Sequence, residues 1–569
     1  MSDYKNAALP VDERVDDLLD RMTLEEMIMQ TDQYFSNDFA RRGSDPDRPG
    51  IDMDKLDSLL RGFSCGSIQA RCLTPELINE IQEYALKKTR LGIPFLFSEE
   101  ALHGLCHQQA TSFPQQIGLA ATFNPSLGRA MGRAIGTEAR AMGIHETYSP
   151  VMDLIRDPRY GRAEESYGED TYLCSEFARE VVSGMQGDDL SAPDAVAAEP
   201  KHYAGYGSPV GGLNCAPCSM GRHEVFSDVL PVFEAAVADA GAPDVMCSYN
   251  AIDGIPVSAD HELLTEVLRD QWGMRGFVRS DLTAVERLYD NHYLAATRKE
   301  AMAMGLEAGV DLQLYDFPHD EWQTGLKELV EEGRLDISVI RRAAGRVLRM
   351  KFLLGLFEHP YVDVTRRARY VHNKEHLDTA LEIARQSMTL LKNENGILPL
   401  SKNLRSIAVI GPCAGHAVLG DYIPEGKTGI SALEGIRGIV SPDTEILYDE
   451  GCKILGDTAK PFPARLLTDD EGKPGLTGRY YNGRKPEGKL VATRRDLGIN
   501  FNWIMNNPHP DVDASCFSVR WTGKLTPDET FDGMIGFNTQ DSMRLYVDGE
   551  LLIDGWGEKN DADRTVPFR

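Results

Sequence analysis

The sequence lacks an excess of positive charge, and it lacks any apolar run of membrane-spanning length. Aspartate and glutamate outnumber lysine and arginine by 88 to 60, so the formal net charge at pH 7 is −28. A chain with this charge repels phosphate backbones and anionic lipid headgroups. A helix that spans a bilayer needs about 20 consecutive apolar residues. We therefore expect no nucleic-acid partner and no membrane partner, and a neutral or cationic ligand instead.

The N-terminal segment MSDYKNAALPVDERVDDLLD also lacks the basic stretch and apolar core of a secretory signal peptide. The ten cysteines are scattered through 569 residues. Such spacing is typical of reduced thiols and not of a disulfide framework. Both features predict a cytoplasmic protein.

Three short motifs have the spacing of metal, redox or nucleotide sites but lack the context. CAPC (215–218) has no second cysteine pair nearby, which a zinc site of this type requires. HNKEH (372–376) matches a zinc-protease pattern by its spacing alone. IAVIGPCAG (407–415) lacks the G-x-G-x-x-G spacing of a dinucleotide site, and Pro412 interrupts its turn. We expect no metal and no cofactor.

Short apolar strands alternate with amphipathic helices over residues 1–355. This alternation predicts a parallel sheet covered by helices, and the number of units favours a closed (β/α)8-type barrel over an open sheet. The expected strands are 93–97, 146–152, 194–199, 243–249, 276–278 and 309–314, and the expected helices include 126–142, 222–240, 261–272 and 297–308.

The pattern changes twice after the barrel. Residues 356–380 are typical of a linker, and 381–458 return to an α/β pattern that predicts the first part of an α/β sandwich domain. Residues 459–569 are rich in alternating aromatic segments, which predict an antiparallel β-sandwich module that interrupts the α/β domain. The Asp-Gly pair of VDGE (547–550) predicts a tight turn within that module.

Polar residues follow successive strands of the expected barrel at the carboxyl end of each strand, which is where barrels of this type build their active sites. For any one residue a helix cap or a surface loop is the commoner explanation, and Asp281 in GFVRSDLTAV (276–285) is a good candidate N-cap. The coincidence at five strands predicts a shared site instead. The residues are Glu99, Glu100, Asp153, Arg156, Lys201, His202, Tyr249, Asn250 and Asp281.

Seven stretches together resemble glycoside hydrolase family 3, and they occur in that family's order within residues 10–455. They are SEEALHGL (98–105), SPVMDLIRDPRYGRAEESYGED (149–170), KHYAGYG (201–207), GGLNCAPCSMGRHE (211–224), VMCSYNAIDGIP (245–256), GFVRSD (276–281) and SMTLLKNENGILPL (387–400). Residues 470–569 resemble the protective-antigen-like β-sandwich that some members carry as an insertion. The resemblance implies a retaining exo-β-glycosidase acting on terminal β-D-glucosyl or β-D-xylosyl residues.

The resemblance also implies roles for individual residues. Asp281 matches the catalytic nucleophile, and Met246 and Tyr249 match residues beside it. For Glu224 a catalytic role and a buried salt bridge with a barrel arginine are both open, and Arg156 is a further candidate. The residues that match the sugar-binding wall are Glu100, Arg162, Lys201 and His202.

Two positions depart from the family pattern. Leu282 follows the nucleophile where an aromatic residue is common, and Tyr206 stands where the hexosaminidase branch has a proton-donating histidine. The hexosaminidase mechanism is therefore not expected. A non-catalytic carbohydrate-binding protein derived from such an enzyme is the alternative function. The choice between glucose and xylose stays open at this point.

The acid/base residue is the remaining expectation. In members with the inserted sandwich, the acid/base glutamate lies beyond the insertion, and no residue here aligns with it. We expect residues 1–569 to be the first part of a larger enzyme or one half of a split one. The expected partners are small β-glucosides, β-xylosides or oligosaccharides, together with a second copy or a complementary C-terminal segment.

Overall fold

The computed structural model describes residues 3–42, 49–71, 73–424, 427–452, 461–501, 503, 508–509, 511–512, 516–530, 532–539, 541–557 and 564–568. The chain forms two compact units. The first contains Met1–Arg41, Pro49–Asn395 and Leu419–Lys427, and the second contains Arg42–Arg48, Gly396–Val418 and Thr428–Arg569. Among the described residues no helix is both long and apolar enough to cross a membrane.

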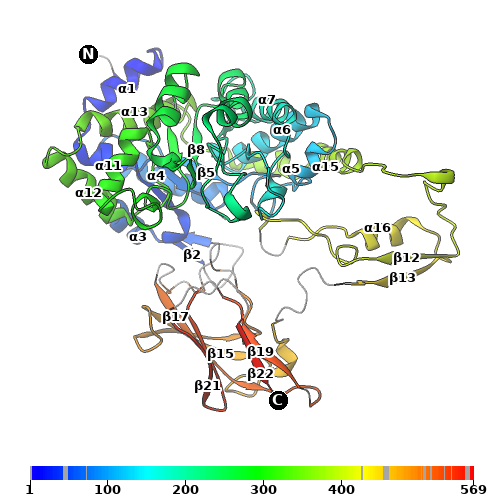
Figure 1. Ribbon diagram of the computed structural model, residues 1–569. Helices are drawn as coiled ribbons and strands as arrows, with labels where there is room; N and C mark the ends of the chain where they lie inside the picture. Colours follow the sequence, from blue (N-terminus) through cyan, green and yellow to red (C-terminus); the bar gives the residue numbers. More distant parts are fainter. Residues whose placement is uncertain are drawn as a thin grey trace. The chain divides into compact units, whose positions relative to one another are not determined.

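A ring of parallel strands forms the centre of the first unit (Figure 1). Single parallel bridges between Tyr203 and Cys247, Arg279 and Leu312, and Asp32 and Gln313 close the ring. The alternation in the sequence thus correctly predicts an α/β barrel. The paired strands are β1 (Gln33–Phe35), β4 (Ser67–Gln69), β5 (Leu96–Glu99), β6 (Glu146–Thr147) and β7 (Ala197–Ala198), and β8 (Val245–Cys247) with β11 (Val278–Ser280).

The strands differ from the expected ones in length and position. The expected strand 309–314 takes part only through the bridges at Leu312 and Gln313. Strands β1 and β4 escaped prediction because QYF and SIQ are too short to show an apolar pattern. β5 to β8 and β11 are two to four residues long and buried throughout, so ring closure rests on few backbone hydrogen bonds.

Helices cover the ring, as Figure 1 shows for α4, α7 and α13 around β5 and β8. Helices α6 and α7 pack closely at two glycines. A Cβ atom added to Gly132 would lie 2.4 Å from the Val181 carbonyl oxygen, and a Cβ atom added to Gly184 would lie 2.3 Å from the Arg129 carbonyl oxygen. The helices are α1 (Val11–Leu19), α2 (Leu24–Met29), α3 (Met53–Leu60), α4 (Pro75–Lys88), α5 (Gln116–Ala120), α6 (Pro125–Ala141), α7 (Thr171–Gln186), α8 (Arg222–Glu224), α9 (Leu230–Glu234), η7 (Glu262–Gln271), α10 (Arg287–Asp290), α11 (Arg298–Ala308), α12 (His319–Glu331) and α13 (Ile337–Leu353).

The division of the chain differs from the expected one, because the segment expected as a linker belongs to the barrel unit. It contains α14 (Arg367–Tyr370) and the start of α15 (Lys374–Gln386), which pack on α6. A buried contact of 2.7 Å joins His376 Nδ1 to Glu138 Oε1 and holds α15 on the barrel. His376 of HNKEH therefore has a packing role.

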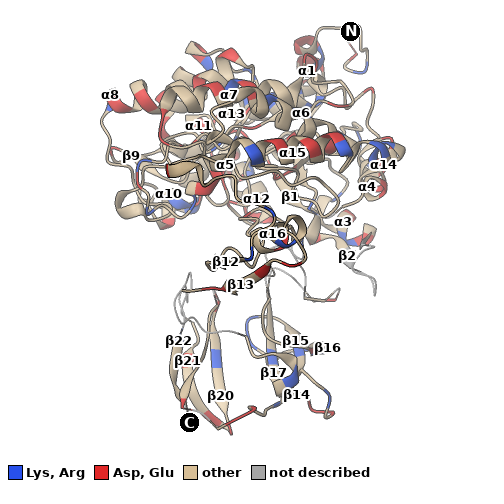
Figure 2. Ribbon diagram, turned by 90° about the vertical axis from the view of Figure 1, so that its right-hand side faces the viewer, with Lys and Arg blue, Asp and Glu red and all other residues tan. Residues whose placement is uncertain are grey.

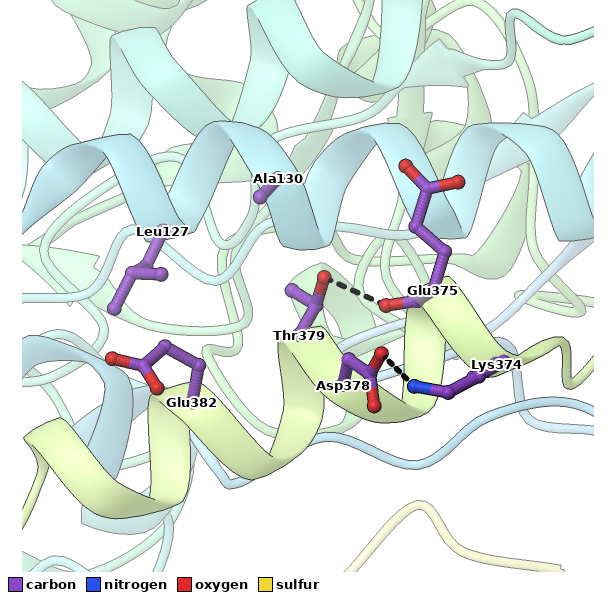
Figure 3. Close-up of a pocket in the computed structure, with 7 residues that line it drawn as sticks. All are labelled: Leu127, Ala130, Lys374, Glu375, Asp378, Thr379 and Glu382. Carbon is purple, nitrogen blue, oxygen red and sulfur yellow. Dashed lines mark hydrogen bonds and ion pairs between the residues drawn. The ribbon is translucent and has the colours of Figure 1, made fainter.

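A surface groove lies between α6 and α15 (Figure 3). Leu127 and Ala130 of α6 face α15, whose Lys374 pairs with Asp378. Basic residues stand near both ends of α15 with acidic residues between them (Figure 2), as on an ordinary solvated helix. The groove contains none of the strand-end residues expected in the site, so it is a seam between two packed helices.

The second unit has an α/β part and an antiparallel part. Asp548 and Gly549 have φ of 49° and 84° in the tight turn that VDGE predicts. β12 (Ser406–Ile410) pairs in parallel with β13 (Glu445–Asp449), and α16 (Ala432–Ile439) connects them. The antiparallel pairs are β15 (Leu476–Asn482) with β16 (Leu490–Asp496) and β17 (Phe517–Thr522), β14 (Leu467–Thr468) with β18 (Lys524–Leu525), β19 (Gly533–Phe537) with β22 (Arg564–Phe568), and β20 (Met543–Val547) with β21 (Glu550–Gly555).

A fully buried arginine links three barrel strands. Arg279 of β11 donates from Nη1 to Glu199 and from Nη2 to Glu146, each at 2.6 Å. All three side chains are shielded from solvent. Removal of one partner of such a pair leaves a buried charge uncompensated, which costs about 3–5 kcal/mol.

We expect Arg279→Met to lower the free energy of unfolding by about 3–5 kcal/mol, or to prevent folding, because Glu146 and Glu199 lose their counterion. Arg275→Met is the matched control, since Arg275 pairs with Asp12 at the surface and such pairs contribute at most about 1 kcal/mol. Urea denaturation followed by circular dichroism measures both. A loss below about 1 kcal/mol for Arg279→Met would contradict the assigned role.

Candidate active site

Asp281 lies directly after β11, at the carboxyl end of the ring, and is 8% exposed. Its backbone N–H donates to the Cys247 carbonyl, which ties it to the end of β8. Its Oδ1 accepts the Leu282 N–H at 2.7 Å. Its Oδ2 has no hydrogen-bond partner of normal geometry among the described residues. One carboxylate oxygen is thus held by the backbone and the other is available to a ligand.

The charge of Asp281 depends on opposing effects. Burial raises the pKa of its carboxyl group above the ordinary value. The positive charges of Arg162 and Lys201 oppose that shift, as does the nearby Tyr249 hydroxyl. The two cations therefore favour the ionised form, which is the form that can act as a nucleophile.

Lys201 and Glu100 form an ion pair from neighbouring strand ends. Lys201 Nζ donates to Glu100 Oε2 at 2.8 Å, and both residues are buried. Burial would lower the pKa of Lys201, but the charges of Glu100, Tyr422 and Asp281 together more than offset it, so that pKa is raised. Burial raises the pKa of Glu100, with Lys201 opposing the shift. The pair offers both a donor and an acceptor to sugar hydroxyls.

His202 has a defined tautomer. Arg162 Nη2 lies 3.1 Å from His202 Nε2, and because a guanidinium only donates, Nε2 is the acceptor. Nδ1 therefore carries the hydrogen and donates to Asp153 Oδ2 at 2.7 Å. Burial and the charges of Arg162 and Lys201 lower the pKa of His202 well below its usual value, so the ring is neutral.

The neutral ring also approaches Asp281. His202 Nε2 lies 3.4 Å from Asp281 Oδ2. Both atoms are acceptors in this tautomer, so their contact is no ion pair. A donor group that enters here would meet Oδ2 of Asp281, because the lone pair of His202 Nε2 already accepts the Arg162 N–H. A sugar hydroxyl is such a donor.

Arg162 is itself fixed by Glu165. Its Nε and Nη2 donate to the two carboxylate oxygens of Glu165, each at 2.8 Å. The guanidinium also lies 5.4 Å from the centre of the Tyr206 ring. A bidentate pair of this kind holds a guanidinium in one orientation. The predicted sugar-binding residues Glu100, Arg162, Lys201 and His202 thus form one connected cluster with Asp281.

Met246 and Tyr249 lie beside this cluster. Met246 is buried against Tyr148 and Leu314. Tyr249 is partly buried, and its ring lies 5.5 Å from that of Tyr206. Burial raises the pKa of Tyr249 well above its usual value, and the charge of Asp281 adds to the shift, so the phenol keeps its proton.

Tyr422 is a member of the cluster that sequence reasoning missed. Its hydroxyl accepts from Arg162 Nη2 at 3.4 Å, and its ring lies 5.0 Å from Lys201 Nζ. The segment Leu419–Lys427 belongs to the barrel unit, and the Asp421 N–H donates to Glu164 Oε1 at 2.8 Å. No local pattern marks this residue, because it follows the nucleophile by more than a hundred positions.

Two predicted residues lie outside the cluster. Arg156 is exposed and pairs with Asp228 at 3.0 Å. Glu224 is exposed at the end of α8. Of the two alternatives left open for Glu224, the buried salt bridge with a barrel arginine is wrong, because Glu224 is exposed.

Glu146, Glu199 and Asp244 offer oxygen atoms within 4.8 Å of one another, an arrangement that could hold a cation. Arg279 already supplies a positive charge to two of them. Burial raises the pKa of Glu199 to about 8 and that of Asp244 well above its usual value, the second helped by the charge of Glu146. Protons and one guanidinium therefore balance this cluster.

The comparisons with known proteins identify two domains in this chain. Residues 57–350, just over half of the chain, match the glycosyl hydrolase family 3 N-terminal domain, and residues 472–568 match the PA14 domain. A putative β-xylosidase of Formosa agariphila is 38% identical over 416 residues, which are 72% of this chain and 55% of that protein.

Solved structures of β-glucosidases are also similar to this chain. A β-glucosidase from Erythrobacter marinus has a TM-score of 0.73 and 36% identity, with 79% of this chain and 60% of that one covered. A β-glucosidase from Listeria innocua in complex with glucose has a TM-score of 0.69 and 33% identity, with 78% and 60% covered. This chain spans about 55–60% of the length of these relatives. The chain belongs to glycoside hydrolase family 3.

Proposed function

We propose that this chain carries the catalytic barrel of a retaining exo-β-glycosidase that removes terminal β-D-glucosyl or β-D-xylosyl residues. The observation that carries the proposal is the buried Asp281 carboxylate at the end of β11, which lies near the Tyr249 hydroxyl and whose Oδ2 has no hydrogen bond of normal geometry to the residues that the structure describes. Lys201 and Arg162 supply positive charge to this carboxyl group. Retaining glycosidases need such a carboxylate to attack the anomeric carbon and form a glycosyl-enzyme.

The remaining cluster fits a sugar-binding subsite. Lys201 and Arg162 donate, Glu100 accepts, and the neutral His202 accepts at Nε2, so donors and acceptors surround the nucleophile. A sugar hydroxyl both donates and accepts, and hydrogen bonds to charged groups each contribute about 1.5–3 kcal/mol. The Tyr422 ring adds a flat wall beside Lys201. The subsite therefore fits a single terminal sugar.

A non-catalytic carbohydrate-binding protein is the second candidate. Leu282, which follows the nucleophile, is 43% exposed and offers no flat aromatic surface to a sugar ring. A protein that only binds would keep Lys201, His202 and Arg162 but would not need a reactive Asp281. Covalent trapping of the nucleophile separates the two functions.

The nucleophile can be tested without its acid partner, because an activated leaving group such as dinitrophenolate needs little protonation. We expect 2-fluoro dinitrophenyl glycosides to label Asp281, and Asp281→Asn to lower dinitrophenyl glycoside turnover by about 10³-fold or more. Mass spectrometry of the labelled peptide and the kcat measure these outcomes. Asp290→Asn, an exposed substitution on α10, is the matched control. Turnover by Asp281→Asn within tenfold of the parent would refute the assignment.

Glu100 provides a test of sugar choice. Two methylene groups separate the Glu100 carboxylate, which binds Lys201, from the backbone. The aspartate side chain is one methylene shorter, so Glu100→Asp would draw the carboxylate back and leave room beside Tyr422. We propose that this reach excludes the C6 hydroxymethyl group of glucose and favours xylose. Glu100→Asp should raise the glucoside-to-xyloside ratio of kcat/KM by about tenfold, the scale of one methylene. An unchanged or lower ratio would contradict this role. Partial unfolding of the variant lowers the kcat/KM of both substrates by the same factor, so it does not change their ratio.

A further inference from the structure

The turn after Asp281 is stabilised by another carboxylate. Asp316 is fully buried, and its Oδ1 accepts the Val285 N–H at 2.5 Å. Its Oδ2 accepts the Ser280 hydroxyl at 2.5 Å, and the Glu286 N–H also contributes to its binding. The three donors come from both sides of Asp281. Asp316 thus fixes the segment that carries the nucleophile at its start and at its end.

These contacts explain why Asp281 is not a helix cap. A capping carboxylate accepts the N–H groups two or three positions further on. Asp281 Oδ1 instead accepts the N–H of the next residue, Leu282. The N–H groups that precede α10, at Val285 and Glu286, go to Asp316. The capping role falls to Asp316, so no backbone N–H of the described residues is bonded to Oδ2 of Asp281.

The turn needs such support because its backbone is unusual. Thr283 has φ of 66°, in the left-handed region that side-chain-bearing residues rarely adopt. Its N–H donates to the Leu314 carbonyl at 3.4 Å, a long contact. Ser280 Oγ also accepts the Leu314 N–H at 2.8 Å, so the Ser280 hydroxyl links the Asp316 carboxylate to the backbone of Leu314. The Asp316 contacts are the shortest that hold this turn.

We propose that Asp316 is a positioning residue for the nucleophile, which holds the turn 282–286 so that Oδ2 of Asp281 faces the sugar. This inference rests on the proposed role of Asp281. A displacement of about 1 Å of a reacting group can reduce a rate by about 10²-fold. Within the part of the chain that the structure describes, Asp316 forms no hydrogen bond or ion pair with Asp281 or the sugar-binding side chains, so its loss should affect the reaction and not the binding of substrate.

The ionised form of Asp316 is the one that accepts all three donors. Burial raises the pKa of Asp316 to about 7, while Ser280 and the backbone N–H groups of Val285 and Glu286 oppose the shift. The other titratable groups that face it are the Glu286 carboxylate and the buried Cys247 thiol. Measurements at pH 8 therefore examine the ionised carboxylate.

The experiment compares Asp316→Asn and Asp316→Ala with the parent chain at pH 8. Inactivation by a 2-fluoro dinitrophenyl glycoside gives a rate constant for the chemical step and a dissociation constant for the reagent. Amide hydrogen exchange of residues 282–286 reports the turn directly. Asp260→Asn is the matched control, since Asp260 accepts the Leu263 N–H at 3.1 Å and caps η7 in the same barrel.

We expect both Asp316 variants to lower the inactivation rate constant by about 10- to 100-fold. The dissociation constant of the reagent should stay within threefold of the parent, and amide exchange at 282–286 should accelerate. The Asp260 variant should change neither quantity. An inactivation rate within threefold of the parent, unchanged exchange, or an equal loss in the Asp260 variant would overturn the proposal.

These readouts separate the two proposals. If the parent chain is labelled at a residue other than Asp281, the proposed function fails, and a role for Asp316 toward the nucleophile fails with it. If the parent is labelled at Asp281 and the Asp316 variants react at the parent rate, only the positioning role fails. Hydrogen exchange then shows whether Asp316 stabilises the turn for folding alone.

Discussion

The ion pairs of Arg279 constrain the whole barrel. Side chains two residues apart on a strand face the same side, so Arg279 lies one step below Asp281, and Glu199 lies one step below Lys201. A slip of one residue would turn all four away from the barrel interior. The contacts of Arg279 with Glu146 and Glu199 therefore fix the register that brings the active-site residues of these strands together.

The charges in the candidate site are also balanced by ion pairs. Each cation has its own carboxylate, Glu100 for Lys201 and Glu165 for Arg162, yet both cations also act on Asp281. Burial alone would favour a neutral Asp281, and a neutral carboxyl group is a poor nucleophile. The cations oppose that effect without forming a direct ion pair with Oδ2 in the described structure. Asp281, the proposed nucleophile, can thus be ionised without a direct ion pair to its Oδ2 among the described residues.

The sequence predicted the parts of the site that follow from local position. Glu100, Lys201, His202 and Asp281 end barrel strands, and strand ends converge in any such barrel. Tyr422 could not be predicted, because the contact that places it in the site joins residues 260 positions apart. Strands β1 and β4 could not be predicted either, because three residues are too few for a periodic signal.

The choice between cap and nucleophile at Asp281 shows why sequence patterns alone remained ambiguous. Ser280-Asp281 before a helical segment is a good capping sequence, and the amides that need a cap do exist after it. The structure supplies the cap from Asp316, which lies on the next strand connection. Asp281 has the sequence context of a helix cap, but the carboxylate of Asp316 accepts the N–H groups that a cap would accept. No local sequence pattern connects Asp316 with Asp281. The availability of Oδ2 of Asp281 to a ligand thus depends on two strand ends together and cannot be predicted from either one alone.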